Sequence, residues 1–96
     1  MASDKEKMLT SANYYAGLVA SAKKACSEAK VSLNNGHSVV QSNWKGESGD
    51  AMAQALNDLL SELNSICKDL AELESQMRSH TKSIYDNWPE EAISET

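Results

Sequence analysis

Residues 42–50 read SNWKGESGD and lie almost at the midpoint of a 96-residue chain. This stretch combines Trp44 with Gly46 and Gly49, and glycine is a typical residue of turns because it adopts backbone conformations that other residues avoid. Elsewhere the residues that break helices are scarce, since the chain contains only four glycines and a single proline, Pro89. We therefore expect a long helix on each side of this turn.

Before the turn, apolar and small residues recur at alternating spacings of four and three, which is typical of a helix that packs along one face. The series consists of Met8, Ala12, Tyr15, Val19, Ala22, Cys26, Ala29, Leu33, Gly36 and Val40. Ser3 followed by Glu6 matches a capping box and predicts a helix that begins near Asp4. We place the first helix at about residues 4–43.

After the turn the same spacing is more regular and more apolar, and it predicts the seam through which a hairpin or a dimer packs. The series consists of Met52, Leu56, Leu59, Leu63, Ile66, Leu70, Leu73, Met77, His80 and Ile84. Pro89 lacks a backbone N–H group and ends the pattern. We place the turn at about residues 44–47, the second helix at about 48–87 and an acidic tail at 88–96.

Two helices of this length, each about 60 Å long, predict an all-α antiparallel hairpin. Residues 1–43 carry five lysines against three acidic residues, whereas residues 44–96 carry four basic residues against eleven acidic ones, so the two helices attract each other. A hairpin of two helices leaves part of its apolar surface uncovered. We therefore expect the chain to dimerise into a four-helix bundle.

Composition and hydropathy exclude several classes of partner. A formal net charge of −5 without a dense basic patch disfavours nucleic acid and anionic membranes. No run of about 18 uncharged apolar residues occurs, so we expect no integral membrane segment. The first residues, MASDKEKMLTSANYY, also lack the basic start and apolar core of a secretory signal peptide.

The sequence contains no pattern that indicates an enzyme or a cofactor site. The stretch from Gly46 to Gly49 lacks the lysine and the preceding strand of a phosphate-binding loop. No two of the possible metal ligands, Cys26, Cys67, His37 and His80, are three or four residues apart on one helix. We expect a protein without catalytic activity, cofactor or metal.

A hairpin of about one hundred residues with Trp-x-Gly at its bend resembles the WXG, or ESAT-like, family of small proteins exported by type VII secretion systems. The matching residues are Trp44, Gly46, the small Ser48 and the apolar Met52. The resemblance extends over essentially the whole chain, because length, central motif and both heptad patterns agree. It implies secretion from the bacterial cytoplasm without a cleavable signal peptide, and a type VII secretion ATPase as partner.

The resemblance also implies an export signal, Tyr-x-x-x-Asp or Tyr-x-x-x-Glu, beyond the second helix. Tyr85 stands near the expected place, but the fourth residue after it is Pro89. The candidate signal therefore consists of Tyr85, Trp88 and Glu90, or it is supplied by a partner chain. Tyr85 is equally explained as an extension of the seam next to Ile84.

Three hypotheses follow from these patterns. The first is a secreted hairpin protein that pairs with itself or with a related hairpin. The second is an accessory hairpin that pairs with the helical N-terminal domain of a larger secreted toxin. The third is a cytoplasmic coiled-coil adaptor without a role in export, which the imperfect tail signal favours.

The two cysteines have a defined relationship in the expected hairpin. If the turn centres near residues 46 and 47, residues at the same height have numbers that sum to about 93, as those of Cys26 and Cys67 do. We expect these two residues at the same height. They form either a disulfide, closed after export, or a pair of buried free thiols.

Overall fold

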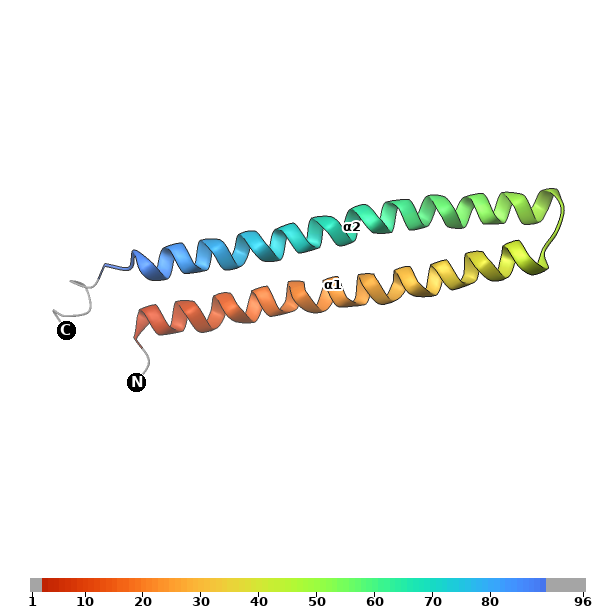
Figure 1. The fold of residues 1–96 in the computed structure, drawn as a ribbon. Coiled ribbons are helices and arrows are strands. Elements are labelled where there is room, and N and C mark those ends of the chain that lie inside the picture. Colours follow the sequence, from red (N-terminus) through yellow and green to blue (C-terminus); the bar gives the residue numbers. More distant parts are fainter. Residues whose placement is uncertain (1–2, 90–96) are drawn as a thin grey trace.

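The computed structural model describes residues 3–89 of the chain and consists there of two antiparallel α-helices, α1 (Asp4–Asn43) and α2 (Glu47–Asp86). Figure 1 shows them side by side over their whole length, with the bend at one end and the start of α1 beside the end of α2 at the other. The longest dimension is 75 Å. The expected all-α hairpin is confirmed.

Both helices have recognisable ends. The Ser3 side-chain oxygen accepts a hydrogen bond of 3.2 Å from the Glu6 N–H group and caps α1, as the sequence predicts. The Trp44 N–H group donates to the Val40 carbonyl at 2.9 Å and closes the same helix. Helix α1 has the expected bounds, whereas α2 begins and ends one residue earlier than expected.

The two helices meet along what we call the hairpin interface. Its half-buried and buried members are Ala12, Ala16, Val19, Lys23, Cys26 and Leu33 on α1, and Leu56, Leu60, Leu63, Cys67, Leu70, Glu74, Met77 and Thr81 on α2. Many of the α1 side chains are small. This composition brings the two backbones close together but buries little apolar area, since burial stabilises in proportion to the area removed from water.

The hairpin interface has a thin core. Among the hydrophobic residues of the described chain, only Ala16, at 1% exposure, and Cys26, at 7%, are buried. Thr81 is also buried, and its hydroxyl group is satisfied within α2 because it donates to the Met77 carbonyl at 2.7 Å. A domain this small with so few buried side chains has little stability to spare.

The structure divides the expected seam of α2 into two rows. Leu56, Leu63 and Leu70 are half-buried in the hairpin interface. Leu59, Ile66 and Leu73 remain 49%, 50% and 44% exposed. The seam expected for a hairpin or a dimer thus divides between the hairpin interface and an exposed surface. In the hairpin interface, the first row is joined by Leu60, Cys67 and Glu74, which stand four residues after its members. That this exposed row packs against a second chain in a dimer stays a prediction.

Candidate functional site

Gly46 is required at the bend by its backbone conformation. Its φ of 98° and ψ of −174° fall in a region that is essentially restricted to glycine. Gly46 lies in the expected turn and is the N-cap of α2, and its carbonyl accepts the Asp50 N–H group at 3.0 Å. The residue that closes α1 is Trp44, in an extended conformation.

Gly49, which sequence reasoning did not single out, is buried against Trp44. A Cβ atom on Gly49 would lie 2.8 Å from the Trp44 carbonyl carbon and 3.0 Å from Cδ1 of its indole ring. Separations this short are not tolerated, so the close return of the chain requires glycine here. A glycine in the first turn of a helix was the available signal, because it is unfavourable there without a packing reason.

The bend carries a shallow groove of about 520 Å³, which we call the bend groove. Its lining is mostly polar and comes from both helices and the turn: His37, Gln41, Trp44, Lys45, Gly49, Asp50, Ala53, Gln54 and Asn57. Trp44 is 45% exposed, so its indole packs on the first turn of α2 with one part and faces solvent with the rest. An exposed aromatic beside hydrogen-bonding groups is a common anchor in protein interfaces.

The candidate export signal lies at the opposite end of the hairpin from the bend groove. Tyr85 is half-buried, and the Lys5 Nζ atom lies 4.0 Å from its ring centroid, so this tyrosine joins the end of α2 to the start of α1. Trp88 is half-buried and its N–H group donates to the Tyr85 carbonyl at 3.3 Å. Glu90 lies outside the described residues.

Trp44 and Tyr85 therefore do not form one site within a chain. Figure 1 shows that the bend and the end of α2 are separated by the full length of the helices, about 60 Å for 40 residues. The sequence-based hypothesis that these residues act together requires two chains in antiparallel arrangement.

One side of the hairpin carries an exposed apolar row, which we call the apolar flank. It consists of Met52, Leu59, Ile66 and Leu73, spaced seven residues apart and each 40–50% exposed. Seven residues correspond to nearly two helical turns, so the four side chains line up along α2. The hairpin itself therefore leaves a row of aliphatic side chains only partly covered.

The other side of the hairpin is more polar. Asn57 and Asn64 follow the interface residues Leu56 and Leu63 by one position, whereas Leu59 and Ile66 follow them by three, which places the two sets on opposite flanks of α2. Asn57 and Asn64 line a groove of about 740 Å³ together with Ser27, Lys30, Val31, Asn34, Leu60 and Ser61. This side thus carries fewer exposed aliphatic side chains than the apolar flank, with Val31, at 61% exposure, among its lining residues.

On α1, the positions on the same side as the apolar flank are mostly small. Tyr15, Ala22 and Ala29 stand three residues after the interface residues Ala12, Val19 and Cys26, as Leu59 and Ile66 do on α2, and all three are exposed. The large aliphatic side chains of α2 thus stand beside Ala22 and Ala29, which we call the alanine row and which a second helix could approach closely, with the larger Tyr15 at one end.

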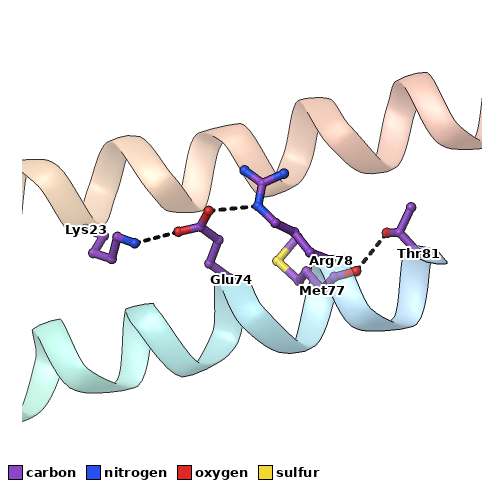
Figure 2. Close-up of polar contacts among 5 residues, drawn as sticks. All are labelled: Lys23, Glu74, Met77, Arg78 and Thr81. Carbon is purple, nitrogen blue, oxygen red and sulfur yellow. Dashed lines mark hydrogen bonds and ion pairs between the residues drawn. The ribbon is translucent and has the colours of Figure 1, made fainter. Parts of the chain in front are cut away.

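A charged cluster crosses the hairpin interface between Lys23 of α1 and Glu74 of α2. Figure 2 shows the Glu74 carboxylate between two cations, with Oε1 2.8 Å from Lys23 Nζ and Oε2 2.8 Å from Arg78 Nε. The Glu74 side chain is only 14% exposed. The Lys23 ammonium group at Oε1, then the hydrogen bond from Arg78 to Oε2, lowers the pKa of Glu74 below its ordinary value.

Cys26 and Cys67 form a disulfide across the hairpin interface, with their α-carbons 5.8 Å apart. This separation lies within the usual range for such a bond. The expectation that they lie at the same height is confirmed, and of the two alternatives the bridge is the one observed. Cys26 is buried at 7% exposure, whereas Cys67 is half-buried.

The described residues form neither a metal site nor a membrane span. Between Ser3 and Pro89, no group of three or more His, Cys, Asp or Glu side chains is arranged to hold a metal ion. Within the same range neither helix contains a segment apolar and long enough to cross a membrane.

Comparison with family models, with curated proteins and with solved structures found no match to this chain. Any proposal of function for this chain therefore depends on the residues and geometry described above.

Proposed function

We propose that this chain is a non-enzymatic hairpin protein of a type VII secretion system, exported itself or serving as a partner that targets another chain for export. The observation that carries the proposal is the combination of a Trp-x-Gly bend between two 40-residue helices with an apolar flank that the hairpin itself does not cover. Its action is the formation of a four-helix bundle with a second hairpin.

The shape of the apolar side supports a second copy of this chain as the partner. In a symmetric pair, the aliphatic row of α2 from one copy packs on the alanine row of α1 from the other, and the reverse contact forms by symmetry. Large side chains fitting against small ones is the packing that helix bundles use.

Charge supports the same arrangement. The half of the chain that contains α1 has more basic than acidic residues, and the half that contains α2 is strongly acidic. Packing α2 of one copy on α1 of the other brings opposite charges together, whereas packing α2 on α2 brings like charges together. Both considerations therefore favour crossed pairing of the two hairpins.

A symmetric dimer with crossed pairing has both bends at the same end. The sequence-based hypothesis on Trp44 and Tyr85 needs the alternative dimer, in which the hairpins are antiparallel and each helix packs on its own copy. In that alternative dimer, the bend of one chain lies near the Tyr85 end of the other. The exposed part of Trp44 in the bend groove, Tyr85, Trp88 and Glu90 of the partner chain then form a composite surface for a secretion ATPase. This places the two candidate signals, which lie far apart in one chain, in one location.

The accessory hairpin that pairs with a toxin's helical N-terminal domain is the second candidate. The departure from Tyr-x-x-x-acid at Pro89 favours it, because a chain with an incomplete signal depends on its partner for export. The apolar flank serves this function equally well, with the toxin domain in place of the second copy.

The oligomeric state tests the dimer directly. Light scattering on the purified chain should give twice the chain mass. In the oxidised chain, Ile66→Asp, on the apolar flank, should give a monomer of unchanged helicity. Asn64→Asp adds the same charge to the polar flank two residues away and should leave the dimer intact. A wild-type chain that stays monomeric at all concentrations would rule out the homodimer and favour the accessory hairpin.

Export is tested in the native host. Trp44→Ala and Tyr85→Ala should each reduce the amount of protein in the medium while the folded protein accumulates in the cells. Val31→Ala truncates a side chain that is 61% exposed on α1, away from both ends of the hairpin, and should be exported normally. Normal export of the Trp44 and Tyr85 variants would leave these residues with a packing role alone.

A further inference from the structure

The proposed function does not use the Cys26–Cys67 disulfide. It lies near the middle of both helices and joins them across the hairpin interface, with a sequence separation of 41. Both cysteines of the chain are consumed by it, so no free thiol remains. A covalent bond in this position restricts the separation of the helices more than one at either end would.

The contacts around the disulfide are weak by themselves. The described chain buries only Ala16 and Cys26 among its hydrophobic residues, and Cys26 belongs to the disulfide itself. Next to it, Lys23 and Glu74 occupy interface positions that apolar residues would fill in a stronger core. Leu59, Ile66 and Leu73, on the apolar flank, remain 44–50% exposed and so add only part of their apolar area to the interface.

The expected contribution of the bond is large relative to such an interface. Closing a loop of 41 residues removes conformational entropy from the unfolded chain and shifts folding by about 600-fold, roughly 4 kcal/mol, in the chain-entropy model. Small domains have total stabilities of the same order. Without the bond, most of the tendency to form the hairpin must come from a partner that covers the apolar flank.

We infer that the Cys26–Cys67 pair is a redox lock that decides whether the hairpin needs a partner. In the disulfide form the single chain keeps its two helices paired. In the dithiol form the single chain opens, and pairing of the helices requires a second hairpin on the apolar flank.

Closure of the lock is a thiol–disulfide exchange with a small-molecule disulfide such as oxidised glutathione. The Cys67 thiolate, the more accessible of the two, attacks the small disulfide, forms a mixed disulfide and releases one glutathione thiolate. The Cys26 thiolate then attacks Sγ of Cys67 and releases the second. The two protons lost by the cysteines end on the two glutathione thiols, so the exchange is balanced.

The lock makes the hairpin depend on its partner before export and not after it, a consequence that rests on the proposed function. In the reducing cytoplasm the chain is a dithiol and is held closed by its partner. Outside the cell oxidation closes the bond, and the hairpin then keeps its shape after the partner leaves. The disulfide and the partner both stabilise the hairpin, so their effects are linked. The factor by which the disulfide strengthens partner binding equals the factor by which a bound partner makes the disulfide harder to reduce.

Solution scattering on the monomeric fraction tests the lock without any secretion host. The chain oxidised with glutathione disulfide should keep a radius of gyration near the 21.6 Å of the hairpin. After reduction with a phosphine it should move toward about 31 Å, the value for an unfolded chain of this length. Urea unfolding of the same samples should show the 600-fold difference as a higher midpoint for the oxidised chain.

Cys26→Ala/Cys67→Ala is the matched control. It should behave like the reduced wild-type chain and should not respond to the phosphine, which shows that the reductant acts only through this pair. Two outcomes overturn the inference: a reduced monomer with the radius and urea midpoint of the oxidised one, or two free thiols per chain after treatment with glutathione disulfide. Neither depends on export, so failure of the secretion test leaves this result unaffected.

Discussion

Gly49 packs so closely against Trp44 that its α-carbon has no room for a side chain. The added Cβ atom would lie 2.8 Å from the Trp44 carbonyl carbon. This contact fixes how tightly α2 returns after the bend, and it explains the spacing of tryptophan and the second glycine. The indole is held at the bend by this packing, whatever else it binds.

Gly49→Ala should therefore destabilise the hairpin by about 1–3 kcal/mol, because the first turn of α2 must move away from Trp44. Gly36→Ala is the matched control. A Cβ atom there meets nothing within 4 Å, so this change should stabilise α1 by about 0.5–1 kcal/mol. Urea unfolding of the oxidised chain measures both. Equal stabilities of the two variants would contradict the close contact at the bend.

Gly46→Ala should also destabilise, for a different reason. Its φ of 98° is unfavourable for alanine although no atom is near, so the cost is backbone strain of about 1–3 kcal/mol. Gly17→Ala, which likewise meets nothing within 4 Å but lies inside α1, provides the comparison and should be neutral or stabilising. A Gly46→Ala variant as stable as Gly17→Ala would show that the bend relaxes without strain.

The pH dependence of stability should be sensitive to Glu74. The pKa of this carboxyl group is lower in the folded chain than in the unfolded chain, where it is about 4.3. Its contribution is therefore complete above about pH 4.3 and is lost as the pH falls through the lower, folded value. We expect the urea midpoint of the wild-type chain to decrease as the pH is lowered from 5 to 3. The midpoint decreases because protonation of Glu74 removes its ion pairs with Lys23 and Arg78.

Glu74→Gln removes this titration and identifies its share of the pH dependence. The variant should be less stable than the wild type at pH 7 and should lose less stability on acidification. Glu72→Gln, at an exposed position on the same helix, should follow the wild-type profile. Parallel profiles for the wild-type and Glu74→Gln chains would show that the ion pairs contribute nothing measurable, as is common for exposed pairs.

Much of the fold could be predicted from the sequence because its strongest signals are local. Ser3 with Glu6 marks the start of α1, and the scarcity of glycine and proline leaves room for one break only. The matching heights of Cys26 and Cys67 follow from equal rise per residue in both helices. These features depend on neighbours in the chain and not on the partner helix.

The rotation of α2 about its axis could not be predicted in the same way. Leu56, Leu59, Leu60 and Leu63 are all aliphatic, so the pattern is compatible with more than one facing direction. The choice depends on what α1 presents, and the cross-helix contact between Lys23 and Glu74 helps to set it. Glu74 was missed for the same reason, since an acidic residue among many on an acidic helix carries no signal of its own.

The two rows of α2 should respond differently to a charge. Leu63 is half-buried in the hairpin interface, whereas Leu59 is 49% exposed on the apolar flank. Leu63→Asp places an unpaired charge between the helices and should cost about 3 kcal/mol or more in the monomer, since the carboxylate loses water without gaining a partner. Leu59→Asp keeps its carboxylate in solvent and should change the stability of the monomer by no more than about 0.5 kcal/mol.

In the dimer, the difference in stability between the Leu63→Asp and Leu59→Asp variants should be smaller, because Leu59 is then covered and its replacement weakens association. Urea unfolding of oxidised protein, below and above the concentration at which light scattering detects dimer, separates the two effects. If both variants lose the same stability as monomers, the division of the aliphatic residues into an interface row and a flank row is wrong.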